Sequence, residues 1–298
     1  MKVFMTGGTG FVGTYLSWEL AQAGHTITIL SRRAQPPVPG EISFLTGNPT
    51  QEGPWMAVVP EHDWIINLAG ASIFTRWSEA HKKEIFESRV NTTRNLVAAL
   101  AAGDRRQLFC STSAVGYYGP RGEEVLTEDS PPDAGFLGDL AKAWEAEALK
   151  AQDLGVRVVV TRFGIVLGRD GGALGQMAPL FKKFLGGPTG SGDQWFSWIH
   201  QADHARAFRF IQENPQISGQ VNFTAPHPVR NRELAKALGR ALHRPGFMPA
   251  PEFMVRLVLG EFADTLLTGQ QVLPKRLLDA GFQFEFPTIE AALTDLLG

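Results

Sequence analysis

Short apolar runs of strand length alternate with amphipathic stretches of helix length through the first two thirds of the chain. Six runs are expected to be strands: Lys2–Met5, His25–Leu30, Ile42–Leu45, Trp64–Leu68, Leu108–Ser111 and Val156–Thr161. The last run is almost continuously apolar, which is typical of strands that a parallel sheet buries on both faces. Because strands that alternate with helices indicate βαβ units, the pattern predicts an α/β fold with a doubly wound parallel sheet.

Two helices are predicted between these runs. The first begins at Gly13, carries Leu16, Leu20 and Ala23 at helical spacing, and stops at Gly24, a residue type that commonly ends helices. The second runs from Ser78 to Ala102, and its spacing turns five apolar residues inward: Ile85, Val90, Leu96, Val97 and Leu100.

Beyond Gly168 the composition changes to a glycine-rich stretch and then a proline-rich tail with helical segments. Four segments are expected to be short helices: Asn231–His243, Pro251–Leu259, Lys275–Ala280 and Thr288–Leu297. We expect residues 1–168, with strands that return from 195–225, to form a nucleotide-binding domain, and 169–298 to form a small, mainly helical substrate lobe. The cleft between lobe and sheet is then the natural place for a ligand.

The composition narrows the class of protein. With 298 residues and 44% hydrophobic content the chain can bury a large core, and its formal charge of -2 supplies no bulk attraction to nucleic acid or anionic membranes. Its single cysteine, Cys110, cannot form an internal disulfide, which favours a reducing compartment. The N-terminus lacks a signal-peptide pattern and no apolar run spans a membrane. We expect a cytoplasmic monomer or homodimer that binds a small molecule, without nucleic acid, membrane or metal as partner.

A glycine turn follows the first strand directly and precedes the first helix. Residues 6–13 read TGGTGFVG, a pattern that in this context indicates a dinucleotide site of the Rossmann type. Gly7 would permit the tight turn, Gly10 the close approach of backbone to pyrophosphate, and Gly13 the packing of helix on strand. The glycine pattern can also be counted from Gly8, so the sequence does not decide whether Gly7 or Gly8 is its first glycine.

The end of the second strand indicates which nucleotide binds. Sites that prefer NAD place an acidic residue there to bond the ribose hydroxyls. This chain instead has Ser31, Arg32 and Arg33, and guanidinium groups pair with a 2′-phosphate. The stretch therefore favours NADP(H), unless both arginines are only solvated loop charges.

Several motifs together resemble an extended short-chain dehydrogenase/reductase. Besides the glycine turn these are NLAG at 67–70 and STSAVGYYG at 111–119. The segments NLAGASIFTRW, SRVNTTRNL, TRFGIVLG, SWIHQADHARAF and most of the tail resemble an atypical, NAD(P)-dependent epimerase/dehydratase-like branch with a C-terminal domain of unknown function, which includes YfcH-like bacterial proteins. The resemblance covers essentially the whole chain. With the turn and the arginines, it implies cofactor contacts at Gly7, Thr9, Gly10, Phe11, Val12, Gly13, Ser31, Arg32, Arg33, Leu68, Ala69, Gly70, Lys142 and Phe163.

The acid–base pair of that superfamily is incomplete in this chain. The superfamily's tyrosine stands four residues before a lysine that lowers its pKa. Lys142 is present within GDLAK, but Gly138 occupies the tyrosine position. Tyr15, Tyr117 and Tyr118 are the only tyrosines, and none stands four residues before a lysine.

Three side chains are candidates to replace the missing tyrosine. Ser113 matches the superfamily's serine and would bond a substrate oxygen, or else cap the strand end. Tyr118 would serve as an acid, or else pack in the core. Asp139 would act if desolvated, or else only interact with the helix dipole. The candidate catalytic set is Ser113, Tyr118 and Lys142, where Lys142 also anchors the nicotinamide ribose.

Two functional hypotheses follow. The first is an NADP(H)-dependent epimerase or reductase that acts on a sugar-like or small carbonyl substrate, with Arg76 and Trp77 as a possible clamp for an anionic ring. The second is an NADP(H)-binding regulatory or structural protein without catalysis, which the missing tyrosine favours. The glycine turn supports both hypotheses.

Overall fold

The computed structural model describes residues 1–36, 40–100, 107–169 and 171–298. A seven-stranded sheet forms its centre, in the order β11-β7-β5-β4-β1-β2-β3, and all neighbouring strands run parallel. The strands are β1 (Lys2–Thr6), β2 (Thr26–Ser31), β3 (Ile42–Thr46), β4 (Trp64–Asn67), β5 (Leu108–Ala114), β7 (Arg157–Phe163) and β11 (Gly219–Phe223). The strand order reverses between β1 and β4, as in doubly wound nucleotide-binding sheets.

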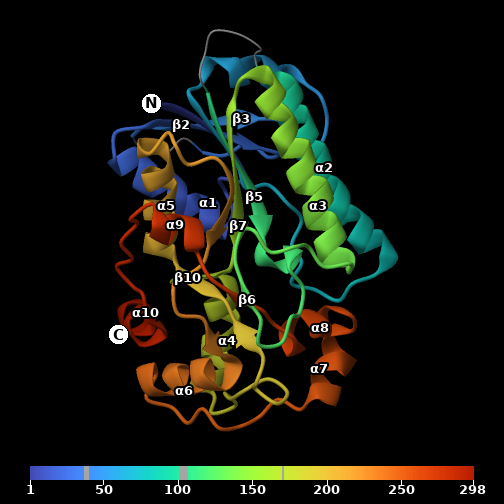
Figure 1. Cartoon of the computed structure of the whole chain (residues 1–298), viewed down its shortest axis with the longest axis vertical. Helices are drawn as coiled ribbons and strands as arrows, with labels where there is room; N and C mark the ends of the chain where they lie inside the picture. The colour runs from blue at the N-terminus through green and yellow to red at the C-terminus, as the bar shows by residue number, and fades with distance from the viewer. Residues whose placement is uncertain (37–39, 101–106, 170) are drawn as a thin grey trace.

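Helices cover both faces of this sheet (Figure 1). One face carries α1 (Phe11–Gln22) and α5 (Gln201–Glu213), and the other carries α2 (Glu79–Ala99) and α3 (Phe136–Leu149). Side chains alternate between the two cores, so that Val3 and Met5 pack toward α1 while Phe4 packs toward α2. The predicted α/β class with a doubly wound parallel sheet is confirmed.

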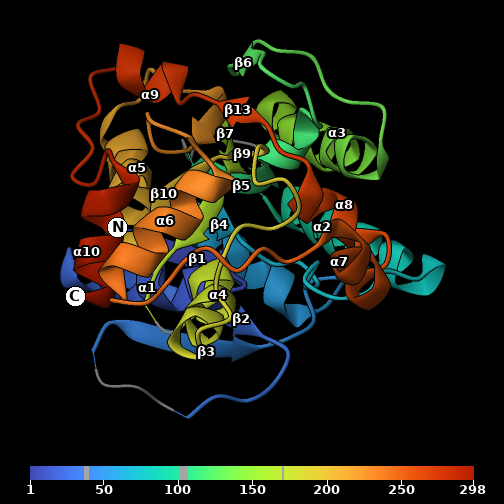
Figure 2. The same ribbon diagram turned by 90° about the horizontal axis from the view of Figure 1, so that it is seen from below.

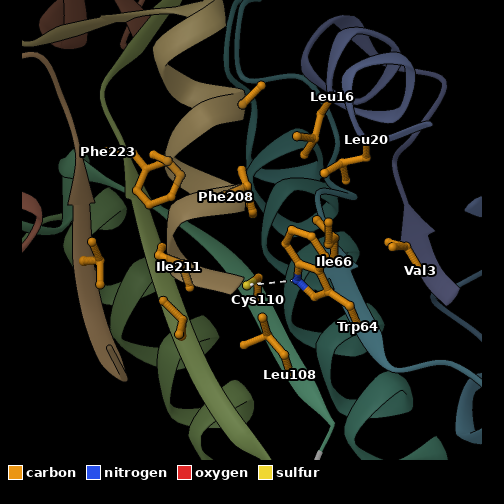
Figure 3. Packing of buried hydrophobic residues seen from close by; sticks show 14 of the residues in the cluster. Val3, Leu16, Leu20, Trp64, Ile66, Leu108, Cys110, Phe208, Ile211 and Phe223 are labelled. Carbon is orange, nitrogen blue, oxygen red and sulfur yellow. Dashed lines mark hydrogen bonds between the residues drawn. The ribbon is translucent and has the colours of Figure 1, made fainter. Parts of the chain in front are cut away.

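The core beneath α1 and α5 includes the only cysteine (Figure 3). Cys110 Sγ accepts a hydrogen bond of 3.3 Å from Trp64 Nε1, and both residues are fully buried. Burial raises the pKa of the Cys110 thiol to about 12, so it stays protonated and packs as a small apolar group.

Most of the remaining helices and the short strand pairs lie beyond the carboxyl ends of the strands, in the lower half of Figure 1 and in front in Figure 2. The helices are α4 (Gly172–Lys182), α6 (Asn231–Ala241), α7 (Glu252–Leu259), α8 (Phe262–Leu267), α9 (Lys275–Asp279) and α10 (Ile289–Leu297). Short strand pairs join β8 (Ile165–Leu167) to β10 (Trp198–His200), β9 (Trp195–Phe196) to β12 (Val229–Arg230), and β6 (Val125–Leu126) to β13 (Gln271–Val272). Three 3-10 helices complete the described chain: η1 (Pro54–Glu61), η2 (Val115–Tyr117) and η3 (Lys150–Leu154).

Element boundaries differ most clearly from the predictions at the first helix and at the long helix. The first helix begins at Phe11 rather than Gly13, and the long helix ends at Ala99, while residues 101 and 102 of its predicted range lie outside the described residues. Of the five residues predicted to face inward, Ile85, Val90, Leu96 and Leu100 are buried and Val97 is partly buried. None of the helices in the described ranges is both long and apolar enough to cross a bilayer.

Candidate functional site

The glycine turn between β1 and α1 has a separate steric reason for each glycine. Gly7 has φ +71°, and a Cβ there would lie 2.7 Å from the carbonyl carbon of Leu68. A Cβ on Gly13 would lie 2.6 Å from Gly8 Cα and would also overlap the Gly7 carbonyl oxygen. At Gly10 only the Gly7 oxygen lies within 4 Å, at 3.3 Å, so the space above Gly10 is open. The tight turn therefore belongs to Gly7, and Gly10 is the glycine that leaves room for a ligand.

The N-terminus of α1 is available to an anion. Gly10 is the N-cap, no side chain caps the helix, and no acidic residue lies in its first turn. The first N–H groups of a helix have no partner within it, and its dipole is positive there. Only the backbone of Phe11 can contribute, because its ring packs against the loop where a Cβ on Gly168 or Gly172 would lie 2.8 or 2.6 Å from ring atoms.

Two exposed arginines, Arg32 and Arg33, follow the end of β2. Among the described residues no ion pair or hydrogen bond engages either guanidinium group. Ser31 fixes the turn, since its Oγ donates to the Arg33 carbonyl oxygen at 2.8 Å. This edge is adjacent to the glycine turn because β2 pairs with β1.

The loop after β4 lies on the other side of the glycine turn. Leu68 N donates to Thr6 O at 3.1 Å, and Gly7 lies directly against Leu68 and Ala69. The structure thus brings the predicted contacts at the turn, at β2 and at residues 68–70 to one edge of the sheet, at the point where the strand order reverses. This is where open α/β sheets bind their ligands.

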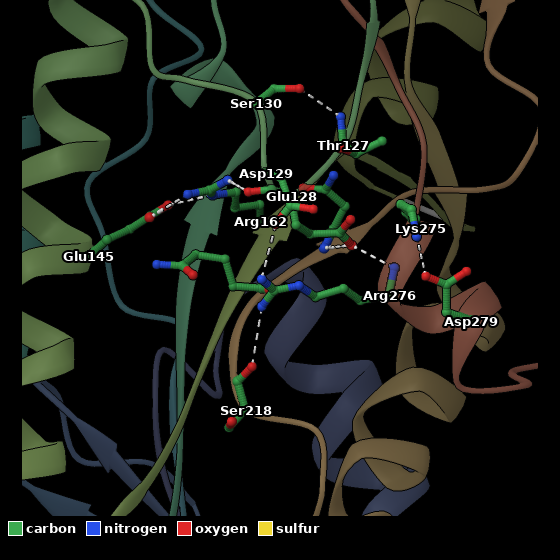
Figure 4. A network of polar contacts seen from close by, with 12 residues as sticks. Thr127, Glu128, Asp129, Ser130, Glu145, Arg162, Ser218, Lys275, Arg276 and Asp279 are labelled. Carbon is green, nitrogen blue, oxygen red and sulfur yellow. Dashed lines mark hydrogen bonds and ion pairs between the residues drawn. The ribbon is translucent and has the colours of Figure 1, made fainter.

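Ser113 belongs to a buried ion-pair network, of which Figure 4 shows Glu145 and Arg162. Its hydroxyl donates to Glu145 Oε1 at 2.7 Å. Glu145 also accepts from Arg162, with Nε to Oε1 and Nη2 to Oε2 both at 2.8 Å. Although burial alone would lower the pKa of Arg162, the hydrogen bonds and charge of Glu145 raise it above its usual value. Ser113 therefore completes the solvation of Glu145 rather than facing an open space.

Tyr118 lies in the same network and is fully buried. Its hydroxyl donates to Asn222 Oδ1 at 2.7 Å and accepts from Arg162 Nη1 at 2.8 Å. Burial raises the pKa of Tyr118 to about 12, despite the opposing charge of Arg162. In this arrangement the hydroxyl has its partners within the protein and presents no face to a ligand.

Unlike the buried Ser113 and Tyr118, Lys142 is exposed to solvent. Its Nζ pairs with Asp139 Oδ1 at 2.6 Å, and the two side chains are 44% and 59% exposed. The preceding turn of α3 explains the missing tyrosine, since a Cβ on Gly138 would lie 2.9 Å from the Asp133 carbonyl carbon and closer still to its oxygen. The backbone of Asp133 therefore fills the space in which a side chain at 138 would begin.

Other predicted residues are already engaged by the protein. The indole ring of Trp77 packs against Phe136 and Phe262, so the expected clamp is covered by α8, while Arg76 is exposed. Phe163 stacks on Phe223 and meets the edge of His204 at 4.4 Å between ring centroids.

The sequence reasoning did not identify Glu145, Arg162 or Arg89 as residues of interest. Arg162 lies within the TRFG segment of a buried strand, and an arginine in such a run signals a buried partner. Glu145 carries no such local signal, since it occupies an ordinary helical position.

A cavity of about 790 Å³ lies apart from these residues, beside α6. Its lining includes Arg232, Lys236, Arg240, Arg244 and Phe247, and none of the predicted cofactor contacts. The candidate site therefore rests on the glycine turn and the strand ends rather than on this cavity.

Comparisons with known proteins agree along the whole chain. Residues 3–222 match the model of the NAD dependent epimerase/dehydratase family, and residues 250–296 match a domain of unknown function, DUF1731. The epimerase family protein YfhF of Bacillus subtilis is 40% identical over 304 residues, covering 100% of this chain and 98% of the relative. The chloroplastic SDR39U1 homologue of Arabidopsis thaliana is 40% identical, covering 100% of this chain and 87% of its own length.

Comparison with solved structures also finds similarity over the whole chain. The human epimerase family protein SDR39U1, crystallised with NADPH, superposes with a TM-score of 0.88 at 37% identity, covering 100% of this chain and 99% of that one. A nucleoside-diphosphate sugar epimerase from Corynebacterium glutamicum gives 0.81 at 32% identity, covering 100% of this chain and 58% of its own. A UDP-glucose 4-epimerase from Thermus thermophilus, at 19% identity and a TM-score of 0.79, shares the fold.

Proposed function

Since the chain belongs to the NAD dependent epimerase/dehydratase family, we propose that it binds NADP(H) across the carboxyl ends of β1, β2 and β4. The observation that carries the proposal is the open space above Gly10 at the uncapped N-terminus of α1. A phosphate there would accept hydrogen bonds from the first N–H groups of the helix and interact favourably with its dipole. The human relative, which was crystallised with NADPH, supports the same nucleotide.

The exposed guanidinium groups at the end of β2 support NADP(H) over NAD(H). A 2′-phosphate placed between Arg32 and Arg33 would gain charge-assisted hydrogen bonds, each worth about 1.5–3 kcal/mol. No acidic residue stands at this strand end to bond the free 2′-hydroxyl of NAD(H).

For the reaction, we propose reduction or epimerisation of a sugar-like or small carbonyl substrate that has yet to be identified. When bound, the nicotinamide supplies or accepts a hydride. Lys142 would leave Asp139 and donate to the nicotinamide ribose hydroxyls, which its exposure permits. Ser113 and Tyr118 would support this edge by holding Glu145 and Arg162 in place, rather than by proton transfer.

A second candidate function is a cofactor-binding regulator without catalysis. It is favoured by the backbone of Asp133 that fills the tyrosine position, and by the internal bonding of Ser113 and Tyr118. The two functions share the nucleotide site and differ only in turnover.

Calorimetric titration tests the nucleotide site. NADPH should bind at least about tenfold more tightly than NADH, and Arg32→Ala should remove that preference by weakening NADPH alone. Lys142→Ala should weaken both nucleotides by roughly ten- to a hundredfold, because they share the nicotinamide ribose. Lys150→Ala, which removes a lysine just past the other end of α3, is the matched control and should bind like wild type. Equal affinities for NADPH and NADH would contradict the proposal.

Turnover separates the two candidate functions. NADPH oxidation is followed against a panel of aldehydes, ketones and keto sugars, and epimerisation of sugar nucleotides is followed by NMR. Product formation by the wild-type protein that is lost in the Lys142→Ala variant supports an enzymatic function. Tight NADPH binding without turnover of any of these compounds would favour the regulator.

A further inference from the structure

Arg89 is a charged residue that forms no ion pair with any residue the structure describes. It lies on α2 and is only partly exposed, with its guanidinium flat against the loop after β4, where a Cβ on Gly70 would be 2.8 Å from Arg89 Cζ. The Trp144 ring lies near it, 5.3 Å from Cζ to the ring centroid. The one described hydrogen bond of the Arg89 guanidinium goes from Nη1 to the Ile85 carbonyl oxygen at 3.1 Å, which leaves its other donors without a described acceptor.

The missing charge contrasts with the surroundings of Arg162. That arginine is almost fully buried and has both carboxylate oxygens of Glu145 at 2.8 Å. Around Arg89, in contrast, no carboxylate of the described residues forms an ion pair. Burial lowers the pKa of Arg89 to about 10, so it stays charged at neutral pH and cannot avoid the cost of desolvation by losing its proton.

The position of Arg89 indicates what supplies the opposite charge. Gly70 follows Leu68 and Ala69, the residues that contact the turn glycine Gly7. The guanidinium is therefore separated from the glycine turn only by the short loop 68–70. Because β4 and β1 are neighbours, both features lie at the edge where the proposed nucleotide would cross the sheet.

We propose that the Arg89 guanidinium is an oxyanion-binding group of the nucleotide site, and that it bonds a phosphate oxygen of the cofactor's diphosphate bridge. The inference rests on the proposed NADP(H) site and adds a specific residue and ligand group to it. The diphosphate would then be held from two sides, by the N-terminus of α1 and by Arg89. A side chain at position 70 would displace the guanidinium, which gives a physical reason for glycine in the NLAG segment.

The test compares ligands that differ in the diphosphate. NADPH and NADH both contain it, whereas 2′-AMP keeps the adenine, the ribose and the 2′-phosphate without it. Arg89→Met, which retains an apolar stem against Trp144, should weaken NADPH and NADH alike by about tenfold or more, while competition by 2′-AMP stays unchanged. Arg32→Ala should give the opposite pattern, with 2′-AMP and NADPH weakened and NADH unaffected.

Three further variants keep the result interpretable. Arg89→Lys retains the charge and should recover part of the lost affinity. Lys83→Met removes an exposed positive charge from the same helix and should bind both nucleotides like wild type. If Arg89→Met does not fold, Arg89→Gln takes its place. Because an unpaired charge is removed, the neutral variants should unfold no earlier than wild type without nucleotide and should gain less from added NADPH.

The outcomes distinguish the proposed NADP(H) site from the proposed role of Arg89 within it. Wild-type protein that fails to bind NADPH would overturn the nucleotide site itself. Wild-type binding with full NADPH affinity in Arg89→Met would overturn only the role of Arg89. Equal losses for NADPH and 2′-AMP, or a lower melting temperature of the nucleotide-free neutral variants, would show that Arg89 supports the structure instead of a phosphate.

Discussion

At the scale of single residues, His204 shows that burial in the core lowers the pKa of a histidine and keeps it neutral. Its side chain is fully buried among Phe163, Phe208 and Phe223, with ring centroids 4.4 to 5.5 Å away. Burial lowers the pKa of His204 to about 3, and no carboxylate contacts it in the described part of the chain. The imidazole is therefore neutral throughout the physiological range and acts as a packing group.

The lowered pKa of His204 predicts a loss of stability in acid. Between about pH 6.5 and pH 3 the unfolded chain binds a proton at this site and the folded chain does not, so stability falls as the pH drops through that window. The slope from one such group is at most about 1.4 kcal/mol per pH unit. Urea unfolding of His204→Leu from pH 7 to pH 4 should show a shallower fall than wild type.

An exposed histidine provides the control for this measurement. His227→Gln should keep the wild-type slope. Burial also lowers the pKa values of His25, His62 and His200, so the slope of His204→Leu should be reduced rather than abolished. Equal slopes in wild type and His204→Leu would mean that the folded protein protonates His204 without strain.

At the scale of elements, the turn between β1 and α1 contains one glycine that leaves space for a ligand, Gly10, and one that the fold itself requires, Gly13. Gly10 has φ -82° and ψ 173°, extended values that any residue adopts, and the space around it is open. Gly13 instead faces the backbone of Gly7 and Gly8. The two positions are three residues apart and should respond to the same substitution differently.

Valine at each position tests this separation. Gly10→Val should fold with a melting temperature close to that of wild type and lose NADPH binding, because its methyl groups occupy the space proposed for phosphate. Gly13→Val should lose about 1–3 kcal/mol or more of stability, since backbone must move to make room. Circular dichroism melts and calorimetry measure both. Wild-type affinity in Gly10→Val would place the diphosphate elsewhere.

Most strands could be predicted because their signal is local. The six predicted runs match β1, β2, β3, β4, β5 and β7 to within a few residues, since each is an apolar stretch bounded by polar or glycine residues. β5 extends to Ala114, past its predicted end, because Asn67 and Glu145 bond the side chains of Ser111 and Ser113 and allow them to be buried. The two- and three-residue strands of the C-terminal region had no periodicity to detect.

The chemistry of the site was less predictable than its fold. Arg32 and Arg33 stay a prediction, which rests on their place at the strand end and on the geometry of dinucleotide sites. Tyr118 was a candidate from sequence, yet its partner Asn222 is 104 positions away and comes from β11. Such long-range pairing depends on the order of strands in the sheet, which apolar runs do not encode.

At the scale of the whole molecule, Asp203 joins the sheet region to the C-terminal tail. It is fully buried in the first turn of α5, and its carboxylate accepts from the backbone N–H groups of Glu285 and Phe286, both at 2.8 Å. Arg206 Nη1 donates to the same carboxylate at 2.7 Å. The contact fixes the segment that leads into α10.

Removing this carboxylate should release the tail. Asp203→Ala leaves two amide groups without acceptors, which costs about 1–3 kcal/mol for each group that stays buried. Hydrogen exchange at Glu285 and Phe286 should accelerate together with a lower melting temperature. Asp279→Ala removes an exposed partner of Lys275 and should change neither measurement. Unchanged exchange at the two amides in Asp203→Ala would show that the tail is held by its apolar contacts alone.

The backbone of Asp133 beneath Gly138 limits which sequences can be reached from this one by single changes. Tyrosine at 138 would have to displace a carbonyl group of the preceding loop before its hydroxyl could approach any substrate. A single substitution to tyrosine at 138 would therefore lose stability before it could add any chemistry. A tyrosine at 138 would need the loop around Asp133 to change its conformation first. Directed evolution that randomises 131–135 together with 138 can therefore yield a folded tyrosine variant, whereas randomising 138 alone should not.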